Sequence, residues 1–573
     1  MGEEYDWGRL ECDMSVELLA GLRPEDLGLD PSEFPEYRRD ARTGREVQLE
    51  VIEFGSYCEK RVAATNAPTG IGKQVIAVSI AKITNMRTVI GTATKALQDQ
   101  YVRKLGHAGL VEIKGRANYQ CAGFGHVDCR GGVTLGCKYS KGPSCPYRGA
   151  LERARGSGLV VANYAYWLTA NDKGGGLARV GEDREDFGDN PVELLVLDEA
   201  DQAPQWLEEY LAVRVYEGEV KRWCDPKRLG EEVTEWVGLA GGVLDGLGED
   251  LKARTVVLKG KGRSATKTEL DEHHRLEKLK SKLERIKGMS GGDWVIERRD
   301  GTRWGREWRF DVVWPGRYAE QYLFCKVGKV VMMSATLRPK TLGLLGVSRG
   351  EYEFREWPRV FPANRHPIYL CPARGDDGKE VRVDRRTTEA DMGLWLEHLD
   401  RILDGRLDRR GIIQTVSYDR AKYILDSSRH RDSMLGNTSD PDSETAVEIA
   451  EEFRRREPPA ILVSPSFAIG WDFPGVECEY IIVCKVPFKP SMGKVGRARE
   501  QRDAQYSAYL TMQELVQGCG RGMRSEDDRC EVFVTDGHLG WFLGKFGSLG
   551  PDWFKLAVRR VSEIPVAPEK LQK

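Results

Sequence analysis

A glycine-rich loop between an apolar strand and a helix constrains this fold more than any other feature of the sequence. In RVAATNAPTGIGKQV (61–75), Gly70 and Gly72 allow the backbone to bend so that its N–H groups face one point. The helix beginning near Lys73 adds the positive end of its dipole, and Lys73 places a charge where the β- and γ-phosphates of a nucleotide would lie. The pattern favours a nucleotide-binding α/β domain over a glycine-rich turn without function.

This loop departs twice from the G-x-x-x-x-G-K-[ST] pattern. Ala67 replaces the first glycine, which leaves the turn feasible, and Gln74 replaces the Ser or Thr. The second change removes the hydroxyl that normally ligates Mg²⁺, so a Gln amide oxygen or a bridging water must take its place. The residues predicted to contact the nucleotide here are Pro68, Thr69, Gly70, Ile71, Gly72, Lys73 and Gln74.

A second polar signal follows the apolar run of LLVLDEAD (194–201). A buried strand that ends in two carboxylates presents them at its carboxyl edge, where α/β sheets bind ligands. We expect Asp198 to hold Mg²⁺ through water and Glu199 to polarise the attacking water. The alternative is an acidic helix N-terminus, where carboxylates are favourable in any case.

The chain has 573 residues, too many for a single hydrophobic core. Apolar β-like runs alternate with helical segments in two α/β blocks, and two insertions of different composition interrupt the first block. The predicted boundaries are an N-terminal arm at 1–44, a first α/β domain at 45–113, 151–205 and 311–345, insertions at 114–150 and 206–310, and a second α/β domain at 346–573.

The first insertion carries four evenly spaced cysteines, with seven residues between neighbours: Cys121, Cys129, Cys137 and Cys145. Structural zinc sites usually contain a close C-x₂₋₄-C pair, and this segment has none. Four thiolates on a glycine-rich loop could instead surround a cubane [4Fe–4S] cluster, in which each iron needs one sulfur. Zinc and free thiols remain the alternatives.

The second insertion is basic, with 17 Lys/Arg against 9 Asp/Glu over residues 251–310. Residues 269–287 are predicted to be helical, and 293–310 to form a hairpin turning at Asp300-Gly301. The charge fits either a solvated helix face or a phosphate-binding surface. Trp294, Trp304 and Trp308 fit either base stacking or packing of the hairpin core.

Composition limits where the protein acts. A net charge of −2 means that any nucleic-acid surface must be a local groove. No window approaches the ~18 apolar residues of a membrane span, and the N-terminus does not resemble a signal peptide. We therefore expect the protein in the cytoplasm of a prokaryotic or phage-infected cell, where thirteen cysteines would not form disulfides.

Read in order, the motifs resemble those of superfamily 2 helicases of the XPD/DinG group. KGRANYQC (114–121) followed by CPY (145–147) is the most group-specific stretch. Gln48, with Arg45 ahead of it, resembles the adenine-reading glutamine, and MSATL (333–337) the motif that couples hydrolysis to strand movement. That resemblance assigns the coupling role to Ser334, Ala335 and Thr336.

Two further motifs of this resemblance lie in the second α/β block. Gly470 and Asp472 in AIGWDFPG fit the fifth motif. QGCGRGMRSEDD (517–528) fits the sixth, in which Gln517 would contact ATP, and Arg521 and Arg524 would act as arginine fingers. For nucleic acid, the resemblance implies contacts in TATKALQDQ (92–100) and elsewhere, at Thr92, Thr94, Lys114, Arg116, Asn163 and Ser417.

The resemblance implies two RecA-like domains, the first interrupted by an iron–sulfur domain and an arch-like insertion. It also implies an ATP- and Mg²⁺-dependent DNA helicase with a [4Fe–4S] cluster held by Cys121, Cys129, Cys137 and Cys145. Such a protein would move 5′→3′ as a monomer on single-stranded or forked DNA, or on DNA–RNA hybrids, in replication or repair. An ATP-binding scaffold without turnover, favoured by Gln74, and a zinc-stabilised translocase are the alternatives. The helicase hypothesis requires Lys73 and Glu199 to converge with Arg521 and Arg524 on one cleft.

Overall fold

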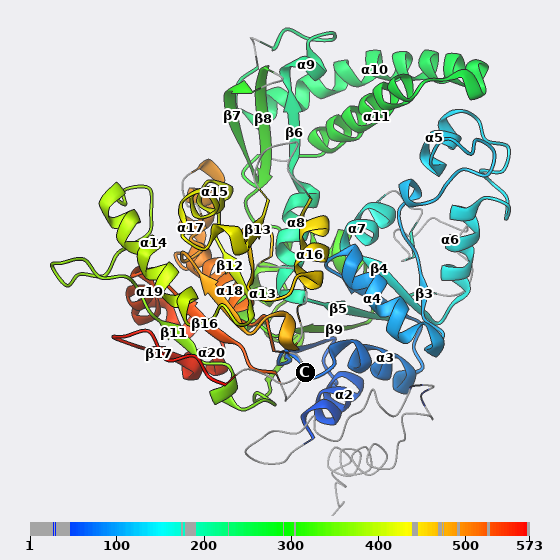
Figure 1. Ribbon diagram of the computed structural model, residues 1–573. Helices are drawn as coiled ribbons and strands as arrows, with labels where there is room; N and C mark the ends of the chain where they lie inside the picture. The colour runs from blue at the N-terminus through cyan, green and yellow to red at the C-terminus, as the bar shows by residue number, and fades with distance from the viewer. Residues whose placement is uncertain are drawn as a thin grey trace, which may run out of the picture.

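Two seven-stranded parallel sheets form the body of the protein, and an arch of two long helices rises above them (Figure 1). The computed structural model describes Leu27, Leu29 and residues 46–172, 176–177, 191–226, 229–289, 291–302, 305–437, 445–467, 471, 473, 475–489, 493–523 and 528–569. Within these residues, no helix is both long and apolar enough to cross a membrane. Arg45, Gly470, Asp472 and Arg524 lie outside the described residues.

The first sheet has the strand order β10-β1-β9-β5-β2-β4-β3. Its strands are β1 (Val62–Asn66), β2 (Thr88–Thr92), β3 (Val111–Glu112), β4 (Leu159–Asn163), β5 (Leu194–Asp198), β9 (Lys329–Ser334) and β10 (Tyr352–Glu356). The helices of this domain include α2 (Val47–Tyr57), α3 (Lys73–Thr84), α4 (Lys95–Leu105), α7 (Tyr164–Asp172), α8 (Ala203–Leu211) and α13 (Pro339–Leu344). Of the five interior strands, β1, β2, β4 and β5 are buried throughout, as expected of parallel strands covered on both faces.

The strand β10 corrects the predicted boundary between residues 345 and 346. Val62 of β1 pairs with Tyr352, so the first sheet extends to Glu356. The sequence YEFRE is a short, partly exposed edge strand, and it lacks the apolar run that identified the other strands.

The second sheet has the order β13-β14-β12-β15-β16-β11-β17. Its strands are β11 (Ile368–Leu370), β12 (Arg410–Gln414), β13 (Met434–Gly436), β14 (Ala460–Ser464), β15 (Tyr480–Val483), β16 (Glu531–Val534) and β17 (Val558–Arg560). Helices α14 (Glu389–Asp404), α15 (Tyr418–Ser427), α16 (Ala446–Arg455), α17 (Lys494–Arg502), α18 (Tyr506–Cys519), α19 (His538–Phe546) and α20 (Asp552–Ala557) belong to it. The predicted fold class, α/β with two RecA-like domains, is confirmed.

The arch combines a small antiparallel sheet with a helical hairpin. The sheet joins β6 (Val213–Tyr216), β7 (Trp294–Thr302) and β8 (Gly305–Val312), and the hairpin joins α10 (Val233–Lys261) to α11 (Lys267–Lys287). A capping box of Thr266 and Glu269 fixes the start of α11. The β7–β8 turn lies later than predicted: Thr302 pairs with Gly305, and Gly301 (φ +75°) falls at an irregularity within the ladder.

Trp294 and Trp308, two tryptophans of the hairpin, pack into the core of the arch. The rings of Trp308 and Trp236 lie 5.3 Å apart, both fully buried, and Trp294 packs 5.8 Å from Tyr318. The base-stacking interpretation is therefore wrong for Trp294 and Trp308, while Trp304 lies outside the described residues. Core packing is the commoner use of tryptophan in a hairpin.

The cysteine-rich segment lies beside the free end of the arch (Figure 1). It contains the short helix α5 (Cys129–Thr134) and leads into α6 (Pro146–Gly156). Leu135 packs with Leu258 and Leu270 of the arch, and the Thr134 hydroxyl lies 3.3 Å from His274 Nε2. Segment and arch therefore meet, and together with the first sheet they surround a channel.

Candidate nucleotide cleft and nucleic-acid channel

The phosphate loop follows β1 and leads directly into α3. Gly70 (φ +88°) and Gly72 (φ +76°) adopt the left-handed conformation that strains other residues, and Lys73 is the first residue of the helix. Gln48 of α2 donates from Nε2 to the Ile71 carbonyl at 2.9 Å. A Cβ on Gly72 would lie 2.8 Å from the same amide, so the glycine is needed for this close approach. The predicted adenine-reading residue thus lies against the loop.

The unusual Gln74 has a partner of its own. Its Nε2 donates to Oε1 of Gln100 on α4 at 3.1 Å. The side chain is thus held toward the neighbouring helix, and its amide oxygen remains a possible metal or water ligand.

Asp198 and Glu199 follow the buried strand β5, close to the phosphate loop. The Asp198 carboxylate is 1% exposed and accepts a hydrogen bond from the Tyr101 hydroxyl at 2.9 Å. Burial and the charge of Glu199 raise the pKa of Asp198 to about 6, while Lys73 opposes the rise. The loop lysine and both carboxylates therefore interact within one site.

Asp201 joins the two domains. Its Oδ2 accepts hydrogen bonds from the Thr336 hydroxyl at 2.6 Å and from the Gln517 amide at the end of α18. Thr336 also lies 3.3 Å from the Ser334 hydroxyl, across Ala335. Burial and Glu199 raise the pKa of Asp201 to about 6. Gln517, predicted to contact ATP, thus contacts the last residue of the DEAD sequence here.

The sixth motif reaches the phosphate loop from the second domain. A Cβ on Gly520 would lie 3.9 Å from the Thr69 hydroxyl. The next residue, Arg521, donates from Nη1 to the Trp471 carbonyl at 2.9 Å. The start of the sixth motif and the phosphate loop therefore face each other across the cleft between the domains.

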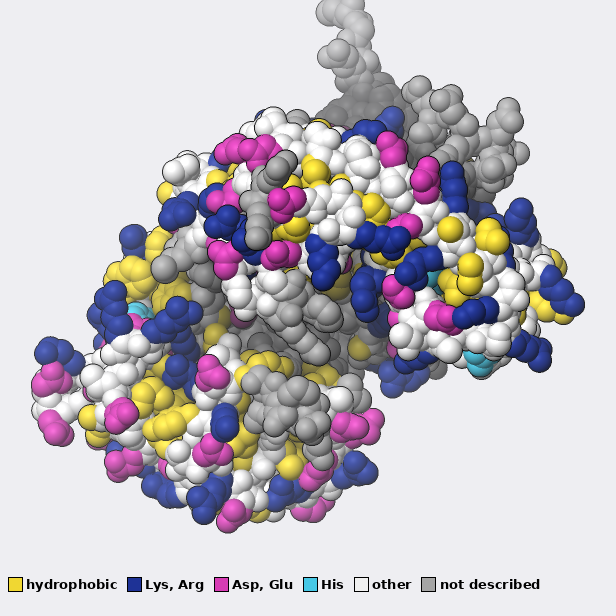
Figure 2. All heavy atoms as spheres, turned by 90° about the horizontal axis from the view of Figure 1, so that it is seen from above, with side chains coloured by type: hydrophobic (Ala, Val, Ile, Leu, Met, Phe, Trp, Pro, Cys, Tyr) yellow, Lys and Arg dark blue, Asp and Glu magenta, His cyan; other side chains and the backbone are white. Residues whose placement is uncertain are grey.

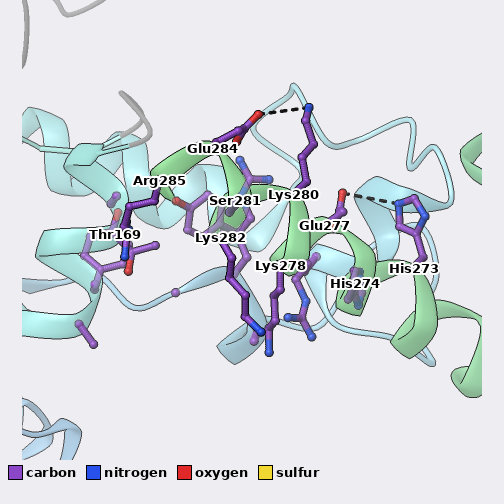
Figure 3. A pocket seen from close by; sticks show the side chains of 18 of the residues that line it. Thr169, His273, His274, Glu277, Lys278, Lys280, Ser281, Lys282, Glu284 and Arg285 are labelled. Carbon is purple, nitrogen blue, oxygen red and sulfur yellow. Dashed lines mark ion pairs between the residues drawn. The ribbon is translucent and has the colours of Figure 1, made fainter. Parts of the chain in front are cut away.

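The second feature is a channel of about 1570 Å³ between the cysteine-rich segment, the first sheet and the arch. Two Glu and eleven Lys/Arg line it, the latter being Lys95, Arg116, Arg130, Arg148, Arg155, Arg214, Lys252, Lys278, Lys280, Lys282 and Arg285. Lys278 and Lys282 extend together to one side of α11, whereas Lys280 pairs with Glu284 (Figure 3). Seen from above, basic side chains gather around a hollow in this face (Figure 2). The channel attracts polyanions.

Some of the predicted nucleic-acid residues line the channel, and the others do not. Arg116 and Asn163 line the channel, with the Arg116 guanidinium 4.6 Å from the centre of the Tyr147 ring. Lys114 instead forms ion pairs with Asp99 and Glu112. The others make local backbone contacts: the Thr92 hydroxyl donates to the Thr94 carbonyl, and Thr94 and Ser417 cap α4 and α15.

The sequence did not predict which individual basic residues of α11 line the channel. Their signal was the excess of Lys and Arg over residues 251–310, which predicted a charged helix without showing which face borders the channel.

The four cysteines of the first insertion are all buried. The Cys129 and Cys145 sulfurs lie 3.6 Å apart, and Cys121 and Cys137 both border Gly132. A Cβ on Gly132 would lie 2.1 Å from the Cys121 sulfur, so glycine makes room for the thiols. Burial raises the pKa of Cys129 to about 12. Each iron of a [4Fe–4S] cluster takes one sulfur ligand, but no group of three or more His, Cys, Asp or Glu in the described ranges is arranged to hold a metal ion.

The two RecA-like domains therefore meet at a cleft that is bordered by the glycine-rich loop and by Asp201. Residues 409–554 match the helicase C-terminal domain family. No curated protein sequence matches the chain.

Solved structures resemble most of the chain. One titled XPD helicase superposes with a TM-score of 0.58 at 14% identity, covering 90% of this chain and 98% of that one. Xpd4 of S. tokodaii gives a TM-score of 0.54 at 13% identity, covering 90% and 100%. The chain therefore has the fold of these XPD structures.

Proposed function

We propose that this protein is an ATP-dependent helicase that moves on single-stranded DNA, 5′→3′ by resemblance, as a monomer in replication or repair. The observation that carries the proposal is the meeting of the two domains at the phosphate loop and at Asp201. Gly520 faces Thr69, and Gln517 donates to a carboxylate only two residues beyond Glu199. A scaffold that merely bound nucleotide would not need this bridge.

In the proposed reaction, the loop amides and Lys73 bind the phosphate chain of ATP. Glu199 accepts the proton of the attacking water, and Arg521 and Arg524 stabilise the charge that develops on the γ-phosphoryl group. Asp198, held by Tyr101, would orient water molecules around Mg²⁺, which neutralises phosphate charge when bound. Closure of the domains on ATP assembles the site.

Asp201 would link domain closure to the coupling motif. Its carboxylate binds both Thr336, at the end of β9, and Gln517, on α18. A shift of Gln517 during hydrolysis therefore changes the environment of the coupling motif. This contact is the physical basis for linking turnover to movement.

DNA would run through the basic channel. Its eleven Lys/Arg neutralise phosphates without reading sequence. The second domain would contact the strand at Ser417, which caps α15. We propose single-stranded or forked DNA, or DNA–RNA hybrids, as substrates in the cytoplasm of a prokaryotic or phage-infected cell.

The cluster would be structural. Cys121, Cys129, Cys137 and Cys145 would each supply one thiolate to a [4Fe–4S] cluster, which cross-links an otherwise irregular loop. The loop carries Arg116 and Arg130 to the channel and packs on the arch. Iron and sulfide assays with visible absorption on anaerobically purified protein distinguish this cluster from zinc.

Phosphate release tests the reaction. Unmodified protein should hydrolyse ATP with stimulation by single-stranded DNA, and Lys73→Ala should abolish the activity; equal activity in that variant refutes the site. Strand displacement on substrates with a 5′ or a 3′ overhang then tests the direction of movement. Displacement from the 3′ overhang alone would contradict the proposed polarity.

The second candidate, an ATP-binding scaffold, is favoured by the engagement of Gln74 with Gln100. Gln74→Thr restores the hydroxyl of the ordinary loop. Turnover in the Thr variant but not in the unmodified protein would support the scaffold; turnover in both would exclude it.

A further inference from the structure

Arg359 lies in the linker between the two sheets, beside the phosphate loop. The strand β10 ends at Glu356 and β11 begins at Ile368, so residues 357–367 join the domains. A small cavity at this position is lined by residues of both domains and of the linker: Pro68, Thr69, Arg359, Phe361, His366, Gly520, Met523 and Trp553. Arg359 therefore shares a cavity with the phosphate loop and with the sixth motif.

The side chain of Arg359 is held by aromatic groups. Its guanidinium lies 5.4 Å from the centre of the Trp553 ring, and its Nη2 contacts Nδ1 of His366. The His366 ring stacks on Trp553, with an angle of 22° between their planes. These contacts fix the position of the guanidinium but supply no negative charge.

Within the described residues, no anionic group neutralises this cation. Its Nη1 is shielded from solvent without a hydrogen-bond partner, and no carboxylate of the described residues pairs with it. Desolvation lowers the pKa of Arg359 to about 10, well short of neutralising it. A desolvated cation without an anion destabilises a fold, so such a group points to a ligand that brings the charge.

The adjoining loop identifies the ligand chemistry. Thr69 and Pro68, which border the cavity, belong to the turn that Lys73 completes, and Gly520 closes it from the other side. An anion here is the phosphate chain of a nucleotide, because Arg presents a fork of donors to phosphate oxygens.

We infer that Arg359 is a nucleotide-binding residue whose guanidinium contacts the phosphate chain of ATP from the linker, with Trp553 and His366 as its positioning residues. The inference rests on the proposed ATPase function and adds a residue outside the recognised motifs. Because Arg359 belongs to the segment that joins the domains, bound nucleotide would also fix the linker.

The test is nucleotide affinity, measured by titration with a fluorescent N-methylanthraniloyl derivative of ATP. Arg359→Gln should raise the dissociation constant at least about tenfold, as loss of a charge-assisted contact does. Arg359→Lys, which keeps the charge but not the fork, should lose less. Arg355→Gln is the matched control: this arginine lies on β10, its side chain is 54% exposed and pairs with Glu353, and its replacement should leave affinity unchanged.

Thermal unfolding without nucleotide separates binding from structure. Arg359→Gln removes an uncompensated charge, so its unfolding midpoint should be equal to or above that of the unmodified protein. ATP affinity equal to that of the unmodified protein overturns the inference, whatever the midpoint. Failure of the unmodified protein to bind ATP would instead refute the proposed function.

Discussion

The interdomain cleft and the basic channel differ in how their polar side chains are satisfied. In the cleft, Asp198 accepts from Tyr101, and Asp201 accepts from both Thr336 and Gln517. In the channel, eleven Lys/Arg border an open space, and several of them form ion pairs, such as Lys280 with Glu284 and Lys282 with Glu219. Lys278 is exposed with no partner among the described residues. The cleft is therefore organised before its ligand binds, whereas the channel acts through summed charge. Single substitutions should be severe in the first and mild in the second.

The largest effect is expected from Glu199→Gln. Loss of the general base should lower kcat for ATP hydrolysis by about 100-fold or more, while nucleotide binding is retained. Phosphate release at saturating single-stranded DNA, with ATP affinity measured alongside, checks this. A kcat within about threefold of the unmodified protein would remove Glu199 from the chemistry.

The activity of the same cleft should depend on pH. The pKa values of Asp198 and Asp201 are both raised to about 6, and the proposed reaction uses both carboxylates ionised. Since kcat/KM reports the free enzyme, it should reach a plateau above about pH 7 and fall at least about tenfold by pH 5. A profile flat from pH 5 to 8 would contradict this assignment.

The pH dependence of folding stability has the opposite sign to that of activity. A carboxyl whose pKa is raised by folding stabilises the fold at low pH, and this contribution is lost as pH rises through about 6. The cleft therefore keeps two buried carboxylates ionised at neutral pH at a cost in stability. That cost is expected of a functional site.

Gln517→Ala should have an intermediate effect. Removing the amide leaves Asp201 with Thr336 and breaks one of the contacts between the domains, so DNA-stimulated hydrolysis should fall about tenfold. Gln505→Ala, at the exposed start of the same helix, is the control and should behave as the unmodified protein. Equal stimulation by DNA in Gln517→Ala would show that coupling takes another route.

The same contrast explains which site residues could be predicted from the sequence alone. Lys73 begins α3 and Asp198 ends β5, each within a short motif whose spacing fixes geometry, and the structure brings them together. Arg359 and Lys278 carry no motif, because their roles arise where separate segments meet. Two residues predicted to meet nucleic acid have partners within the protein instead: Lys114 forms ion pairs with Asp99 and Glu112, and Trp308 packs on Trp236. Such pairings depend on tertiary proximity, which periodicity does not encode.

The smallest effect is expected from Lys278→Ala in the channel. One of eleven basic side chains is lost, so affinity for single-stranded DNA should fall only about two- to fourfold, and the slope of log affinity against log salt by about one contact. Lys267→Ala, on the same helix but outside the channel lining, should leave both quantities unchanged. Titrations of a labelled oligonucleotide at several salt concentrations measure both. A loss above about 100-fold would mean that Lys278 makes an organised contact like those of the cleft, and the contrast between the two regions would fail.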